Sequence, residues 1–78
     1  MDEYIAIVKL FAGPLAPKGY MQCNGQTLPI MENQALFSLL GFTYGGDGKT
    51  TFALPKLEAP AEGMTYVICT DGPYPPRP

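Results

Sequence analysis

The chain has 78 residues, enough for one domain, over residues 1–78, with a small hydrophobic core. Its formal net charge is −2 and only 15% of its residues are charged, against about 25% in an average soluble domain. The few Lys and Arg residues are scattered, which argues against electrostatic binding to nucleic acid, and no apolar run of about 18 residues is present to span a membrane.

The low charge content has two explanations. Either the domain is compact and mostly neutral, or part of its apolar surface is covered by another copy or by a partner. Small size combined with few charges favours the second explanation. The acidic start Met1-Asp2-Glu3 is unlike a signal peptide or a presequence, so we expect synthesis in the cytoplasm without a signal peptide.

The N-terminal part predicts three short strands. Residues 4–11 are rich in β-branched and aromatic side chains, and we expect them to form a strand with one well-buried face. Residues 20–23 and 26–28 predict two further strands. Asn24-Gly25 lies between them, and both residues accept the positive φ of a type I′ turn. We therefore expect these two strands to form a β-hairpin.

A short helix is predicted next, beginning at Glu32 or Asn33. An Asn cap supplies a side-chain oxygen to the first free amides, and Gly41 is placed for a left-handed C-terminal cap. Apolar side chains cover well over half of the circumference, so the helix should be buried on most sides. These side chains are Ala35, Leu36, Phe37, Leu39 and Leu40. We interpret the helix as a central plug with the sheet packed around it.

The C-terminal part predicts a glycine-rich reversal at residues 44–48 and a short strand at residues 50–54. After a loop that includes residues 58–63, residues 64–70 form a clear final strand, and residues 73–78 form a stiff proline-rich tail. The predicted fold class is α+β, with a small antiparallel sheet packed around one short buried helix.

No arrangement of residues predicts an enzyme, a cofactor site or a metal site. Gly48-Lys49-Thr50 matches the end of a phosphate-binding loop, but the first glycine of that motif falls on Thr43 and a helix precedes the loop. Asp47 in the glycine loop is a single carboxylate and therefore a weak cation site. Cys23 has no histidine to activate it, because the chain contains none.

The two cysteines, Cys23 and Cys69, have two interpretations. They are either half-buried reduced thiols or one disulfide, the second requiring that their strands lie side by side. The first is favoured, since two cysteines are few for a disulfide scaffold.

Nine aromatic residues are spread through the chain, and most of them are expected to cover the small core. Exposed tyrosines also occur in protein interfaces and on sugar-binding surfaces, and Tyr44 and Tyr74 are the best candidates here. With the glycine loop they define a candidate interface. Its residues are Tyr44, Gly45, Gly46, Asp47, Gly48, Lys49 and Tyr74.

Six segments, in the order of the family's motifs, together resemble one known family, and the match covers about residues 5–57 without a gap. They are Ile7-Val8-Lys9-Leu10-Phe11-Ala12-Gly13, Ala16-Pro17-Lys18-Gly19-Tyr20, Cys23-Asn24-Gly25-Gln26, Leu28-Pro29-Ile30, Asn33-Gln34-Ala35-Leu36-Phe37-Ser38-Leu39-Leu40-Gly41 and Thr43-Tyr44-Gly45-Gly46-Asp47-Gly48-Lys49-Thr50-Thr51-Phe52-Ala53-Leu54-Pro55. The combination resembles the opening of the phage tail collar domain, a family that includes short tail fibres of contractile phages and bacterial proteins described as microcystin-dependent.

Two departures from that family pattern stand out. Tyr20 replaces a Trp that family members usually carry. Family members typically continue after the position of Leu57 with Asp-Leu-Arg-Gly-Arg and a long receptor-binding region, whereas this chain has only the short loop 58–63. The final strand and the residues after it resemble the segment with which longer members end. The chain therefore resembles a minimal collar without the distal head.

The resemblance implies a non-enzymatic assembly module of a phage tail or a phage-derived injection machine, as a fibre, collar or baseplate component. By analogy with the family it implies a trimer, contacts with other tail proteins and a place in a virion tail or tail-like particle. A free-standing binding module, for example for glycans, is the alternative hypothesis.

Overall fold

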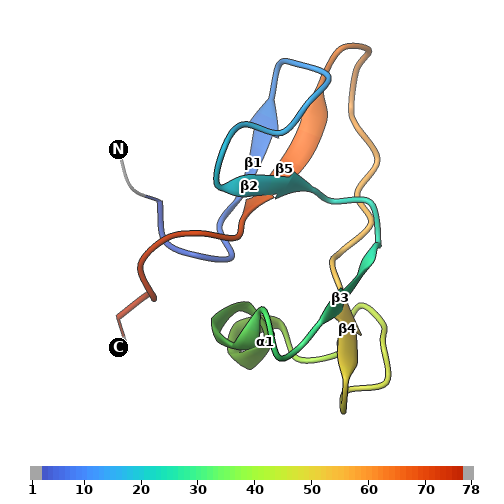
Figure 1. Ribbon diagram of the computed structural model, residues 1–78. Helices are drawn as coiled ribbons and strands as arrows, with labels where there is room; N and C mark the ends of the chain where they lie inside the picture. Colours follow the sequence, from blue (N-terminus) through green and yellow to red (C-terminus); the bar gives the residue numbers. More distant parts are fainter. Residues whose placement is uncertain (1–2, 77–78) are drawn as a thin grey trace.

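The computed structural model describes residues 3–76, so Met1, Asp2, Arg77 and Pro78, which belong to the predicted acidic start and proline-rich tail, lie outside the described residues. The described chain forms two small antiparallel sheets and one short helix, which confirms the α+β class (Figure 1). In chain order the elements are β1 (Val8–Phe11), β2 (Tyr20–Gln22), β3 (Thr27–Pro29), α1 (Gln34–Leu40), β4 (Thr51–Ala53) and β5 (Thr65–Cys69).

The last strand, β5, is the centre of a three-stranded sheet with the order β1-β5-β2. Val8 of β1 and Met21 of β2 both lie opposite Ile68. The run Val67, Ile68, Cys69 is fully buried, because successive residues point to opposite faces and both faces of this strand are covered. The prediction of a final strand is confirmed.

The predicted hairpin at Asn24-Gly25 is wrong. β2 pairs with β5, whereas β3 pairs with β4 in a separate two-stranded sheet. Gly25 has a positive φ of 74°, but Asn24 does not, and a type I′ turn requires positive φ at both positions. Asn24 instead forms an isolated bridge with Lys56, and the chain crosses here from one sheet to the other.

The first predicted strand is shorter and more exposed than expected. A turn closes at Ile7, whose N–H donates to the Tyr4 carbonyl over 3.3 Å, and Ala6 has a positive φ of 77°. The Ala6 N–H donates to the carbonyl of Cys69, whose own N–H donates to the Ile7 carbonyl, so two residues oppose one and form a β-bulge. The bulge interrupts the alternation of faces, and of the predicted strand only Ile5 is buried.

Helix α1 confirms the predicted helix but not its burial. Asn33 is the N-cap, yet its side chain makes no capping bond and donates to the Pro29 carbonyl. Gly41 has a positive φ of 60°, and its N–H donates to the Phe37 carbonyl. Leu36 is buried, but Leu39 is exposed because the helix lies to one side, beside β3 and β4, and is not a central plug (Figure 1).

The core lies between the two sheets and the helix. Its buried residues come from α1, β4, β5 and the segments next to β1, β2 and β4, and the ring of Phe52 packs against that of Phe37 with centroids 5.4 Å apart. The core residues are Ile5, Cys23, Leu36, Phe52, Leu54 and Ile68. This shared core fixes the helix and the glycine-rich loop that follows it relative to the three-stranded sheet.

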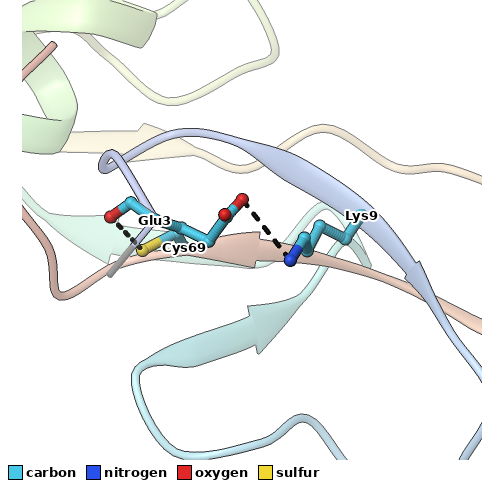
Figure 2. Close-up of polar contacts among 3 residues, drawn as sticks. All are labelled: Glu3, Lys9 and Cys69. Carbon is cyan, nitrogen blue, oxygen red and sulfur yellow. Dashed lines mark hydrogen bonds and ion pairs between the residues drawn. The ribbon is translucent and has the colours of Figure 1, made fainter. Parts of the chain in front are cut away.

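Both cysteines are buried free thiols, so the alternative of a disulfide is wrong. Cys23 lies in the core with Ile68, and Cys69, the next residue of β5, points to the opposite face. There the Cys69 thiol donates to the Glu3 carbonyl over 3.7 Å (Figure 2). Burial raises the pKa of the Cys23 thiol, so this thiol is a poor nucleophile.

Candidate assembly interface

The glycine-rich loop between α1 and β4 is fixed along the free edge of β4. The Ala53 N–H donates to the Gly45 carbonyl over 3.1 Å, and the Gly48 N–H donates to the Thr51 carbonyl over 2.9 Å. Since β3 pairs with the other edge of β4, both edges of this short strand are covered. The loop is therefore part of the folded framework.

Asp47 closes the loop by accepting hydrogen bonds at both carboxylate oxygens. Its Oδ1 accepts from the N–H groups of Thr51, Thr50 and Lys49 over 2.8–3.0 Å, and its Oδ2 accepts from the Thr50 hydroxyl over 2.9 Å. These bonds, that from Thr51 most of all, hold the pKa of Asp47 well below its usual range. Sequence reasoning considered Asp47 as a cation ligand or an interface residue and missed this closing role, although Asp two to four residues before such amides is a known turn signal.

Gly46 allows the loop to approach β4 closely. A Cβ at this position would lie 2.4 Å from the Phe52 Cα and 2.7 Å from the Thr51 carbonyl oxygen. The φ of Gly46 is also positive, at 88°, which favours glycine. The sequence pattern predicted the sharp reversal here but not the contact with β4.

Three of the predicted interface side chains project from this framework. Tyr44 and Lys49 are exposed on the loop, the former with 52% of its surface accessible. Tyr74 is 47% exposed and lies against the helix, where its hydroxyl is 2.6 Å from the Ser38 hydroxyl. The structure thus brings Tyr44 and Lys49 together on one loop. Tyr74, from the C-terminal segment, lies against the helix that precedes this loop.

The helix presents an apolar face to solvent beside Tyr74. Ala35, Ser38 and Leu39 follow the three- and four-residue spacing of one helical face, and all three are exposed. Phe42, just past the Gly41 cap, is exposed as well. No charged residue occurs within Gln34–Leu40. The sequence pattern predicted a helix buried on most sides. In the structure, the chain covers only the side that carries Leu36.

A second exposed apolar surface lies on β1, which sequence reasoning expected to have a buried face. Val8 and Leu10 share the face of Ile68 and Tyr66 in the register, yet they remain 40% and 41% exposed. Neither Val8 nor Leu10 belongs to the core cluster or to the side chains packed against it.

A comparison with protein families places these features in a known group. The family model described as the Phage Tail Collar Domain matches residues 6–60 of this chain. The chain belongs to the phage tail collar domain family. Neither the comparison with curated proteins nor that with solved structures gave a significant match.

The collar match includes β1, β2, β3, α1 and β4, with the whole glycine-rich loop, and it ends before β5. The family is one of phage tail structural domains, which identifies the chain as a structural module of this kind. Collar domains are not known as enzymes. Residues 3–76 contain no group of three or more His, Cys, Asp or Glu side chains placed to hold one metal ion. In the same part of the chain, no helix has the length and apolar character needed to cross a bilayer.

Proposed function

We propose that this chain is a non-enzymatic assembly module of a phage tail or phage-tail-like particle, and that it binds copies of itself and other tail proteins. The role is that of a fibre, collar or baseplate component in the assembled particle. The observation that carries the proposal is collar membership over residues 6–60 in a chain whose own fold leaves apolar surface uncovered.

The composition of α1 supports a contact with another chain. A helix that faces water on one side normally carries charged or polar residues there. The open face of this helix has Ala35 and Leu39 in place of charges, and the exposed Phe42 follows just past the Gly41 cap. Covering these side chains removes apolar area from water, which stabilises the contact by about 25 cal/mol for each Å² buried.

The candidate interface extends from this helix face over the loop. We assign to it Tyr44, Gly45, Gly46, Asp47, Gly48, Lys49 and Tyr74, as expected from the sequence. The pre-formed loop supports this assignment, because a fixed surface loses little conformational entropy on binding. Tyr44 and Tyr74 supply the aromatic area that is enriched at interfaces. Three copies are the number that the family resemblance implies.

Light scattering on the purified chain and immunogold microscopy of tail particles test the proposal together. We expect a stable oligomer without added ligand and label on the particle. A monodisperse monomer that is absent from particles contradicts assembly. If that monomer binds glycans, the free-standing binding module replaces the assembly role as the proposed function.

A further inference from the structure

The three-stranded sheet has one open edge, on the side of β1 that faces away from β5. Backbone groups of successive residues in a strand point to opposite edges. The Ile7 carbonyl accepts a hydrogen bond from β5. Lys9 and Phe11, two and four residues further on, therefore also point their backbone groups toward β5, where they lie opposite Val67 and Thr65. The N–H and C=O groups of Val8 and Leu10 therefore point outward, and no hydrogen bond from residues 3–76 reaches them.

The other edge of this sheet, on β2, is covered by the chain itself. The Tyr20 N–H donates to the Pro17 carbonyl over 3.0 Å, and the Gln22 carbonyl accepts from the Gln26 side chain over 2.9 Å. These are groups that would otherwise face a neighbouring strand. This edge has few groups left for a partner.

The two-stranded sheet is covered in the same way. Pro29 in β3 has no N–H, and its carbonyl accepts from the Asn33 side chain over 2.9 Å. The free edge of β4 is covered by Gly45 and Gly48. Natural proteins protect edge strands by such means. Thr27 of β3 stays open, but within residues 3–76 the stretch Val8–Phe11 is the longest edge without such cover.

The open edge is apolar apart from Lys9, which forms an ion pair within the same chain. Ile7, Val8 and Leu10 are exposed along it. The Lys9 ammonium lies 3.5 Å from a Glu3 carboxylate oxygen (Figure 2). A Lys on an edge normally repels a second identical edge, and this ion pair weakens that repulsion. Unpaired backbone groups between apolar side chains fit another β-strand better than a small molecule or a helix.

We propose that β1 pairs antiparallel with β1 of a second copy, with Leu10 opposite Leu10 of the second copy. The result is one continuous six-stranded sheet across two chains. The inference rests on the self-association proposed above and names one contact that produces it. An antiparallel contact between identical strands is isologous, so it joins copies in pairs and is separate from any three-fold contact.

Among registers centred on Val8, Lys9 or Leu10, the last is favoured. Centring the pair on Lys9 would place two Lys side chains directly opposite one another, which is destabilising. Centring it on Val8 would place Leu10 opposite Ala6, whose N–H already donates to the Cys69 carbonyl. Centring it on Leu10 places Lys9 opposite Phe11 of the second copy, a favourable contact of a cation with an aromatic ring.

Substitution Leu10→Pro tests the hydrogen bonds of this contact. Proline removes the outward N–H, while the β1–β5 ladder, which uses Lys9 and Phe11, retains its donors. We expect dimerisation in sedimentation equilibrium to weaken at least tenfold, because both bonds at the centre of the pair are lost. Leu10→Ala is the control, since it shortens the side chain and keeps the N–H, and it should weaken dimerisation less.

Cross-linking tests the register independently of proline tolerance. Leu10→Cys places two thiols on Cα atoms about 5.5 Å apart, which suits a disulfide. Val8→Cys is the matched control: Val8 has the same exposure on the same edge, but it would lie about 13 Å from its counterpart. The native cysteines are buried and do not compete. We expect rapid oxidative dimers from Leu10→Cys alone.

The outcomes separate the two proposals. Equal cross-linking of both variants, or none from Leu10→Cys, overturns the β1 pairing. An oligomer whose mass is unchanged by Leu10→Pro also overturns it and leaves the assembly role intact. A native chain that stays monomeric at about 1 mM contradicts both self-association and the β1 contact.

Discussion

Asp47 determines the form of its loop through hydrogen bonds that it accepts from the loop itself. One carboxylate satisfies three backbone amides and one hydroxyl, and these fix the path from Asp47 to Thr51. Because the bonds favour the charged form, the folded-state pKa of Asp47 lies below its unfolded value. The bonds therefore add stability above the ordinary carboxyl pKa of about 4, and this contribution is lost as the pH falls below that value.

Substitution Asp47→Asn should lower the melting temperature at pH 7, because a neutral amide replaces a charged acceptor. The difference from the native chain should shrink as the pH is lowered from about 5 to about 2, since over this range Asp47 becomes protonated in the unfolded state, which lowers the stability of the native chain alone. Calorimetry over this range measures the effect.

Asp71→Asn is the control for Asp47→Asn. Asp71 is also exposed and lies in a turn, but its carboxylate accepts no hydrogen bond from residues 3–76. It should show little change at either pH. Equal melting shifts for the two variants would show that net charge, and not loop closure, is responsible.

Gly46→Ala should destabilise the fold by about 2–5 kcal/mol, from positive-φ strain together with the clash against Phe52. Gly63 has a similar φ of 78° but no atom within 4 Å of an added Cβ. Gly63→Ala should therefore cost only about 1 kcal/mol. Urea denaturation of both variants isolates the close approach, and similar losses would contradict it.

At the scale of the element, α1 has one side that supports the fold and one that does not. Leu36 is 1% exposed and Leu39 is 38% exposed on the same helix. Leu36→Ala should cost about 2–5 kcal/mol of unfolding free energy, because it leaves a cavity in the core. Leu39→Ala should cost less than about 1 kcal/mol in the monomer. A loss below about 0.5 kcal/mol for Leu36→Ala would show that the helix does not anchor the core.

The elements could be predicted from the sequence where local preference decides them. The β-branched run of β5 and the stop at Gly41 are such cases. The hairpin prediction failed because Tyr20–Gln22 and Thr27–Pro29 each pair with a strand that is distant in the sequence. The two turn residues carry no information about those distant partners. The length of β1 failed because Ala6 adopts a positive φ that its residue type does not announce.

At the scale of the whole molecule, the sequence could predict the family and the glycine-rich reversal but not which apolar residues stay exposed. Tyr44 and Tyr74 were predicted as exposed candidates and are exposed. Val8 and Leu10 were missed, because alternation predicts which face a residue is on and not whether anything covers that face. Their part in an interface stays a prediction.

The low charge of the molecule predicts how its assembly responds to salt. Contacts built from apolar surface and backbone bonds should persist in about 1 M NaCl, where the screening length is about 3 Å. Ammonium sulfate should strengthen them, since excluded salts favour apolar burial. Light scattering in a salt series measures both effects. Dissociation to monomers in NaCl would show that charged contacts hold the assembly together.

The position of β5 in the chain affects how the protein is made. During synthesis β1 and β2 emerge long before the strand that separates them, since Val8 must wait for Ile68. Until then two apolar segments stay unpaired on the nascent polypeptide, which exposes them to aggregation and to chaperones. A fragment cut at residue 60, where the family match ends, would lack the strand that joins both neighbours and would not complete this sheet.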